Sequence, residues 1–225
     1  MRAPPSGGVS LYFFIEVNMT TPTTKIEAVN SMLSTIGEAP VSSLSSGLVD
    51  AETAETTLNE VSRSVQAMGW NFNTEPDYTI VADSDGNVVL PINTLRADLA
   101  DSQTKYRSSK NEYIQRGNKM YDKRQHTYNI GKDLKLDIVV LLDFELLPEV
   151  ARRYITTMAA RVFQERVVGS DTLSTMNRTD EQQALLALRE MEGDNGDYNI
   201  FDDYGTSSVL DRSIGTKVIR NGTSF

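Results

Sequence analysis

The chain has 225 residues, 39% of them hydrophobic and 24% charged, which suits one large domain or a helical domain that carries a smaller β-rich one. The absence of cysteine and the single histidine, His126, exclude disulfides, thiolate metal sites and any motif that needs two histidines. The net charge of −9 disfavours binding to nucleic acid or anionic membranes, and no apolar run reaches the roughly 18 residues of a membrane span.

Residues 1–21 are predicted to be an N-terminal extension. An apolar run at residues 9–15 follows Arg2, as in a signal peptide, but it is short, Glu16 interrupts it and no small-residue cleavage site follows. We therefore expect a flexible extension, with Met1 or Met19 as the true start.

Two amphipathic helices are predicted next. The first covers residues 24–36, where Thr24 and Glu27 have the spacing of a capping box. The second covers residues 50–68, with Asp50 as its cap. Its apolar stripe consists of Ala54, Leu58, Val61, Val65 and Met68.

The middle of the chain is predicted to be β-rich. The expected strands are residues 78–81, 88–90, 113–116, 119–122 and 136–142. Turn-forming residues at 83–87 join the first two strands, and Gly117 and Asn118 join the next two.

Helical spacing then returns. Pro148 stands where a first-turn proline belongs, and the helix after it continues to Gly169. A further helix is expected over residues 171–191. Residues 193–225 are rich in Gly, Asp, Asn, Ser and Thr and cannot build a core of their own, so we expect an arm that docks onto another surface.

These elements predict an α+β fold. A bundle of about four helices, from residues 22–74 and 143–192, carries an inserted small antiparallel β-module of residues 75–142 and an extended C-terminal docking arm of residues 193–225.

No catalytic, cofactor or metal site is predicted. Residues 83–87 begin like a calcium loop but lack its third ligand and its glutamate, so a turn is the better interpretation. The acids near residues 194–203 are interpreted as a solvated tail. Asp143, Glu145 and Glu149 are interpreted as acids at the start of a helix, and His126 as a surface residue.

A basic, tyrosine-bearing stretch at residues 105–128 has two interpretations. It could bind nucleic acid, or it could meet an acidic protein surface such as a neighbouring copy, which the acidic remainder of the chain favours. The candidate contact residues are Arg107, Tyr113, Arg116, Tyr121, Tyr198, Phe201 and Tyr204, and the candidate structural anchors are Pro40, Trp70, Phe72 and Pro148.

Four sequence blocks occur in a recognisable order. They are Ala28-Val29-Asn30 with Ile36-Gly37-Glu38-Ala39-Pro40-Val41-Ser42, then Gln66-Ala67-Met68-Gly69-Trp70-Asn71-Phe72-Asn73, then Tyr113-Ile114-Gln115-Arg116-Gly117 with Tyr121-Asp122, and finally Leu147-Pro148-Glu149 with the segment at 196–199. From about residue 25 to 205, the chain resembles the tail tubular protein A family, the head-to-tail adaptors of short-tailed, T7-like bacteriophages.

The resemblance implies a structural protein of the virion tail, assembled in the host cytoplasm and without enzymatic activity. It implies a dodecameric ring that binds the portal protein, carries a tail nozzle similar to tail tubular protein B, and offers a surface to a tail fibre or spike. DNA would pass through the lumen during ejection, without specific nucleic-acid binding, and no cofactor or membrane would be involved.

Two other classes of function stay open at this point. One is a carbohydrate-cleaving tail enzyme, because 31 acidic residues could supply the two carboxylates that a glycosidase needs. The other is a regulatory binding module of the host cytosol.

Overall fold

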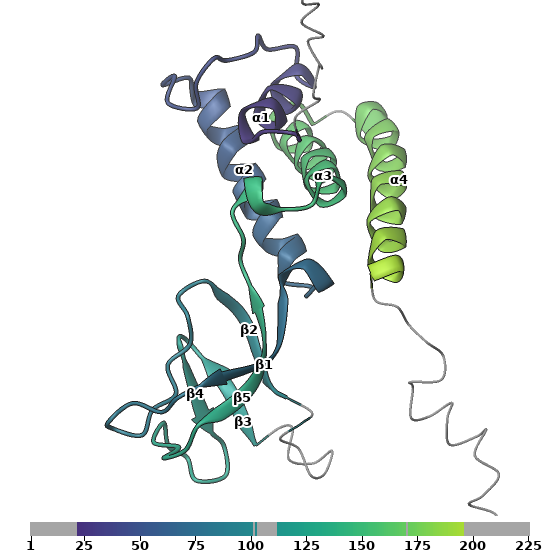
Figure 1. Cartoon of the computed structure of the whole chain (residues 1–225). Coiled ribbons are helices and arrows are strands. Elements are labelled where there is room, and N and C mark those ends of the chain that lie inside the picture. The colour runs from purple at the N-terminus through teal and green to yellow at the C-terminus, as the bar shows by residue number, and fades with distance from the viewer. Residues whose placement is uncertain (1–21, 101, 103–111, 170, 196–225) are drawn as a thin grey trace, which may run out of the picture.

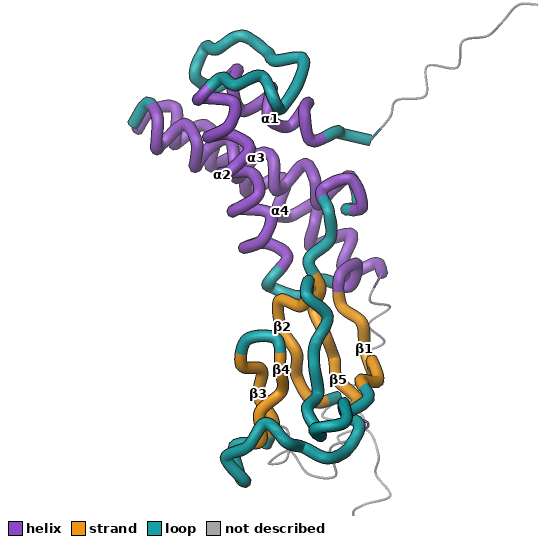
Figure 2. The backbone as a smooth tube through the Cα atoms, turned by 90° about the vertical axis from the view of Figure 1, so that its left-hand side faces the viewer, coloured by secondary structure: helices purple, strands orange, loops and turns teal. Residues whose placement is uncertain are grey.

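The computed structural model describes residues 22–100, 102, 112–169 and 171–195, and it confirms the predicted α+β class (Figure 1). Helices gather at one end of an elongated molecule and a β-module lies at the other end (Figure 2). Strands β1 (Thr74–Ile80) and β5 (Leu134–Val140) lead from one end to the other.

The first helix, α1, spans Lys25–Ser34, and its predicted capping box is confirmed. The Thr24 hydroxyl accepts a hydrogen bond from the Glu27 backbone N–H, and the Thr24 N–H donates to the Glu27 carboxylate at 2.7 Å. The second of these bonds lowers the pKa of Glu27. The capping box therefore supplies partners for the backbone N–H groups of Thr24 and Glu27 at the start of the helix.

The second helix, α2, spans Val49–Gln66, and two details of its prediction were wrong. Leu48, rather than Asp50, occupies the N-cap position, and its side chain forms no capping hydrogen bond. Asp50 lies in the first turn, where its charge complements the helix dipole. Met68 lies beyond the last turn and is 57% exposed, so it does not extend the buried stripe.

The third helix, α3, spans Glu149–Val167 and contacts α1, α2 and the fourth helix, α4 (Asp171–Asn195). Pro148 occupies the cap position of α3, one residue before the predicted first turn. Helix α4 continues to Asn195, four residues beyond its predicted end. The core that these helices enclose includes Val29, Leu33, Leu58, Val65, Ile155, Phe163 and Leu188.

The β-module contains an antiparallel three-stranded sheet in the order β1-β5-β2, with β2 at Thr94–Leu99. The predicted hairpin of β3 (Tyr113–Arg116) and β4 (Lys119–Asp122) is confirmed and lies against β2. The predicted strand at residues 136–142 is β5, the central strand of the sheet, shifted by two residues. Between hairpin and sheet lies a second core, which includes Val88, Leu99, Met120, Leu134, Leu136 and Ile138.

The predicted hairpin between residues 78–81 and 88–90 was wrong. The turn exists, since the Asp83 N–H donates to the Asn87 carbonyl at 2.8 Å, but β1 pairs with β5 instead. Residues 88–90 form only an isolated bridge beside β4, from Val89 to Lys119. Strand β2 was not predicted, although Ala97 and Leu99 alternate with exposed residues as a half-buried strand requires.

Candidate functional site

The joint between the two ends of the molecule is built on Gln66, a fully buried residue in the last turn of α2. Its amide nitrogen donates to the Leu142 carbonyl at 3.0 Å, and its amide oxygen accepts from the Leu142 N–H at 2.8 Å. The side chain pairs with the backbone after β5 as a neighbouring strand would. This contact fixes where the β-module leaves the helices.

Asn73 adds a second amide to the joint and is also buried. Its nitrogen donates to the carbonyls of Gln66 and Val140, both at 2.9 Å, and its oxygen accepts from the Trp70 N–H at 2.9 Å. The Trp70 indole N–H donates to the Val65 carbonyl at 2.8 Å. The Asn73 side chain thus holds both the end of α2 and the end of β5.

Gly69 lets the backbone turn between α2 and these side chains. Its φ of +78° is left-handed, and an added Cβ would lie 2.8 Å from an Arg96 nitrogen and 3.1 Å from a Val139 methyl carbon. Beyond it, Trp70 and Phe72 are half-buried with nearly parallel rings, 6.5 Å between centroids. The block at residues 66–73 therefore forms the joint.

The Asn30 side-chain amide connects the two parts of the sequence block at residues 28–42. Asn30 on α1 donates to the Val41 carbonyl at 3.0 Å and accepts from the Val41 N–H at 2.8 Å. Val41 is buried by this contact, whereas Pro40 itself is exposed. The loop that leads to α2 is fastened to α1 at this point.

The start of α3 holds the segment before α1. The Thr23 N–H donates to the Glu149 carboxylate at 2.8 Å, and the buried Arg152 donates to the Thr23 carbonyl at 2.8 Å. Arg152 also donates to the carbonyls of Leu147, at 2.8 Å, and Glu145. Glu149 therefore serves a structural contact, in addition to its predicted place at the start of the helix.

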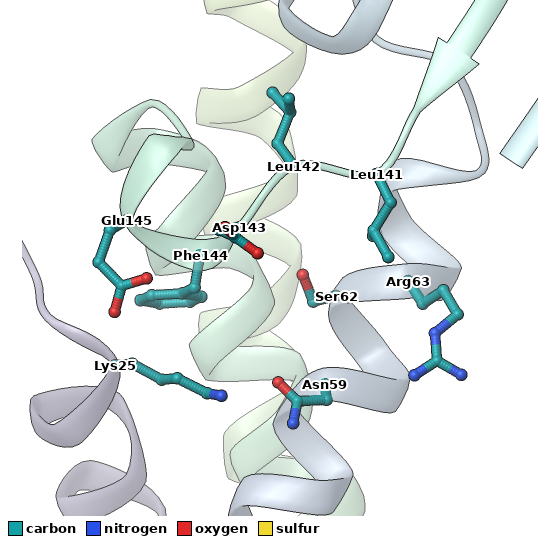
Figure 3. Close-up of a pocket in the computed structure, with 9 residues that line it drawn as sticks. All are labelled: Lys25, Asn59, Ser62, Arg63, Leu141, Leu142, Asp143, Phe144 and Glu145. Carbon is teal, nitrogen blue, oxygen red and sulfur yellow. The ribbon is translucent and has the colours of Figure 1, made fainter. Parts of the chain in front are cut away.

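A cavity of about 250 Å³ lies between α1, α2 and residues 141–145 (Figure 3). Lys25 of α1 and Asp143 both project toward it, but the Lys25 ammonium is paired with Glu55 at 2.7 Å. The remaining lining residues are Asn59, Ser62, Arg63, Leu141, Leu142, Phe144 and Glu145. The lining carries side chains of both charges, Lys25 and Arg63 with Asp143 and Glu145.

The β3–β4 hairpin presents an ordered cationic and aromatic surface. The Arg116 guanidinium lies 3.7 Å from the centroid of the Tyr121 ring, and the Tyr128 ring meets Tyr121 edge-on at 4.9 Å. Tyr113, in contrast, is only 8% exposed, because it faces the core from the other side of the hairpin, with the Lys132 ammonium 5.1 Å from its ring centroid. Arg107, Tyr198, Phe201 and Tyr204 lie outside the described residues.

The turn at residues 83–87 uses its first acid internally. The Asp83 carboxylate accepts hydrogen bonds from the backbone of Asn87 at 2.8 Å and of Asp85 at 3.0 Å, and these bonds lower its pKa. Within the described ranges, no three His, Asp or Glu side chains come together as a metal site. None of the helices in those ranges is long and apolar enough to cross a membrane.

Charge is divided between the two ends of the molecule. Residues 22–74 and 143–195, which hold the helices, contain sixteen acidic and eight basic side chains, whereas residues 75–142 contain ten of each. Arg161 of α3 forms ion pairs with Glu165 of the same helix and with Glu181 of α4, and the second pair ties α3 to α4. The helical end is therefore the source of most of the negative charge.

The sequence profile of the family described as "Tube: Tail tubular protein" matches residues 26–198. The chain belongs to the tail tubular protein family. It is also 27% identical over 167 residues to "Tail tubular protein A" of Klebsiella phage KP34, an alignment that covers 74% of this chain and 86% of the relative. The resemblance predicted from the four blocks is confirmed, with nearly the predicted limits.

As a tail tubular protein, the chain is a structural component of a bacteriophage tail. The blocks at residues 28–42 and 66–73 hold the amide contacts of Asn30, Gln66 and Asn73. These residues shape the molecule from inside, and no pattern of spacing marks them as partners before the fold is known.

Proposed function

We propose that this tail tubular protein is the adaptor subunit of a ring that joins the portal to the tail nozzle, with a surface for tail fibres or spikes. The ring is a homo-oligomer, expected to be a dodecamer, assembled in the host cytoplasm. DNA passes through its lumen.

The observation that carries the proposal is the family match over residues 26–198, together with the elongated shape of the molecule. A subunit with distinct ends can contact different partners along the tail axis while its sides meet neighbouring copies. The acidic helical end suits a channel for DNA, because acidic walls repel phosphates and reduce binding.

The hairpin residues Arg116 and Tyr121 are proposed as subunit or partner contacts, since both lie on the outward face of β3–β4. Trp70, Phe72, Pro40 and Pro148 are proposed as structural anchors, acting on the shape of the subunit. Glu149, one of the three acids at the start of α3, accepts a hydrogen bond from the Thr23 N–H and so takes part in a structural contact.

The test is the mass of the purified chain, alone and mixed with the portal protein of the same phage. We expect a complex of fixed composition that holds many copies of the chain per portal assembly. A chain that stays monomeric and leaves the portal unbound would overturn the proposal. Polysaccharide cleavage lost on a single Asp or Glu substitution would favour the enzyme alternative.

A further inference from the structure

The β-module has two flanks of opposite chemistry on opposite sides. Across the module the strands run β1, β5, β2 and then the β3–β4 hairpin, so that β1 and the hairpin form the two outer sides (Figure 2). Along the sequence, residues 75–101, which contain β1 and β2, hold six acidic side chains and one basic, whereas residues 102–135, which contain the hairpin, hold nine basic and three acidic. The β-module has no net charge, but its acidic and basic side chains are concentrated in different segments.

The hairpin flank consists of Arg116, Tyr121 and Tyr128. Arg116 and Tyr121 lie on the face of the hairpin opposite to the buried Met120, so they point away from the core. Tyr128 is 43% exposed. The stacking of Arg116 on Tyr121 holds the guanidinium in place while its edge stays free to donate hydrogen bonds.

The sheet-edge flank consists of Glu75, Asp77 and Tyr78 on β1. All three are exposed, and Tyr78 keeps 44% of its surface accessible. Among the residues that the structure describes, β1 pairs only with β5, so its other side is an edge of the three-stranded sheet. Neither Glu75 nor Arg116 has an ion-pair partner among residues 22–100, 102, 112–169 and 171–195.

The β1 edge is closed to backbone pairing with another strand. Pro76 lacks the N–H that a ladder needs, and the register shifts between Glu75 and Tyr78, where Asp77 has a φ of +52°. Proline, a bulge and charge are the means by which proteins prevent sheet edges from joining. A partner at this flank must therefore bind through side chains.

We propose that the hairpin flank of one copy docks on the sheet-edge flank of the next copy. The Arg116 guanidinium of one copy pairs with the Glu75 and Asp77 carboxylates of the next copy. The aromatic rings of Tyr121 and Tyr128 pack against Tyr78 of that next copy. Contact between two different patches of one chain is heterologous and closes into a ring when its rotation divides the circle. The inference rests on the proposed ring and names the surfaces that form it.

A second copy suits these flanks better than nucleic acid does. The two flanks carry opposite charge, both include tyrosine, and both belong to the same module, so neighbours side by side bring them together at one level. Nucleic acid would account for Arg116 and its tyrosines, but it would leave the acidic sheet-edge flank, with Glu75 and Asp77, without a partner.

Charge reversal gives the first test, on portal complexes of the full chain. We expect Arg116→Glu and Glu75→Arg each to weaken incorporation into the complex by about tenfold or more, and the double variant to recover it, because the swapped charges attract again. Arg178→Glu, an exposed site on α4, is the control and should incorporate like the wild type. Normal incorporation of both single variants would overturn the inference, as would failure of the double variant to recover.

Cross-linking gives the second test and does not depend on destabilising the contact. Since the chain contains no cysteine, Tyr78→Cys combined with Tyr128→Cys introduces the only thiols. Oxidation or a short bismaleimide should convert assembled chains into a covalent ladder of multimers, whereas Tyr78→Cys with Arg178→Cys should give none. Assembled chains that form no ladder with the first pair would contradict the inference.

The outcomes separate the two proposals. A wild-type chain that does not associate with portal overturns the proposed function, and the inference falls with it. Assembly that tolerates both charge reversals and gives no ladder overturns only the inference. Loss of DNA binding on Arg116→Glu, with assembly unchanged, would assign the hairpin flank to nucleic acid instead.

Discussion

At the scale of single residues, two buried glutamines show opposite uses of the same side chain. Gln66 and Gln164 are both fully buried. The Gln66 amide nitrogen donates a hydrogen bond to the Leu142 carbonyl, and its amide oxygen accepts one from the Leu142 N–H. In contrast, neither amide atom of Gln164 has a hydrogen-bond partner in the described part of the chain. A buried polar group without a partner costs stability, while a satisfied one specifies geometry.

Replacing the two glutamines should therefore have opposite effects. Gln66→Leu should lower the free energy of unfolding by about 2–3 kcal/mol, because both backbone groups of Leu142 lose their partner. Gln164→Leu should leave it unchanged or raise it by up to about 1 kcal/mol. Urea unfolding of the two variants and the wild type measures both, and equal effects would show that the joint does not depend on Gln66.

Tyr154 predicts a loss of stability at alkaline pH. Burial, followed by the charge of Glu181, raises the pKa of its phenol above the ordinary value of 10.0. Its contribution to stability is thus present below pH 10 and is lost as the pH rises through the folded-state pKa. Melting temperatures measured across this range should fall less steeply for Tyr154→Phe than for the wild type, and parallel curves would contradict the burial of this phenol.

At the scale of elements, the turn after α2 controls how the helix meets the sheet. Gly69→Ala should destabilise the fold by about 2–3 kcal/mol, because left-handed backbone strain of about 1–2 kcal/mol combines with the close approach of Val139. Gly37→Ala is the matched control: its φ is +81° but nothing lies within 4 Å of the added Cβ. Thermal unfolding should show the smaller loss for Gly37→Ala.

Local patterns predicted the elements whose signals lie within the chain segment itself. The 3.6-residue spacing and the capping box at Thr24 specify α1, and the Gly117-Asn118 turn specifies the hairpin. The exposed Arg116 and Tyr121 follow from that hairpin. Tyr113, one of the predicted contacts, faces the core of the module, and because Ile114 beside it is also apolar, alternation alone does not show which of the two is buried.

The remaining features depend on pairing between distant segments. Strand β1 pairs with β5, which follows it by more than fifty residues, so the local turn at 83–87 gave the wrong partner. Pro76 disfavours a regular strand at residues 74–77, and the register shift between Glu75 and Tyr78, with Asp77 at a positive φ, accommodates it. The acidic flank was missed for the same reason. Amide contacts such as Asn30 to Val41 leave no periodic signal at all.

At the scale of the whole molecule, the joint, the helical end and the β-module have separate tasks. The amides of Gln66 and Asn73 fix the angle between the two ends. The helical end carries most of the negative charge, and the two flanks of the β-module carry opposite charges. The chain belongs to the tail tubular proteins, which are structural components of bacteriophage tails.

The most direct test of this conclusion is electron imaging of the purified chain assembled with its portal protein. We predict a closed ring, coaxial with the portal and with an open lumen, in which the β-modules of neighbouring copies touch. Portal particles that carry isolated copies, or no copies at all, would contradict the assignment of this chain as the ring-forming adaptor.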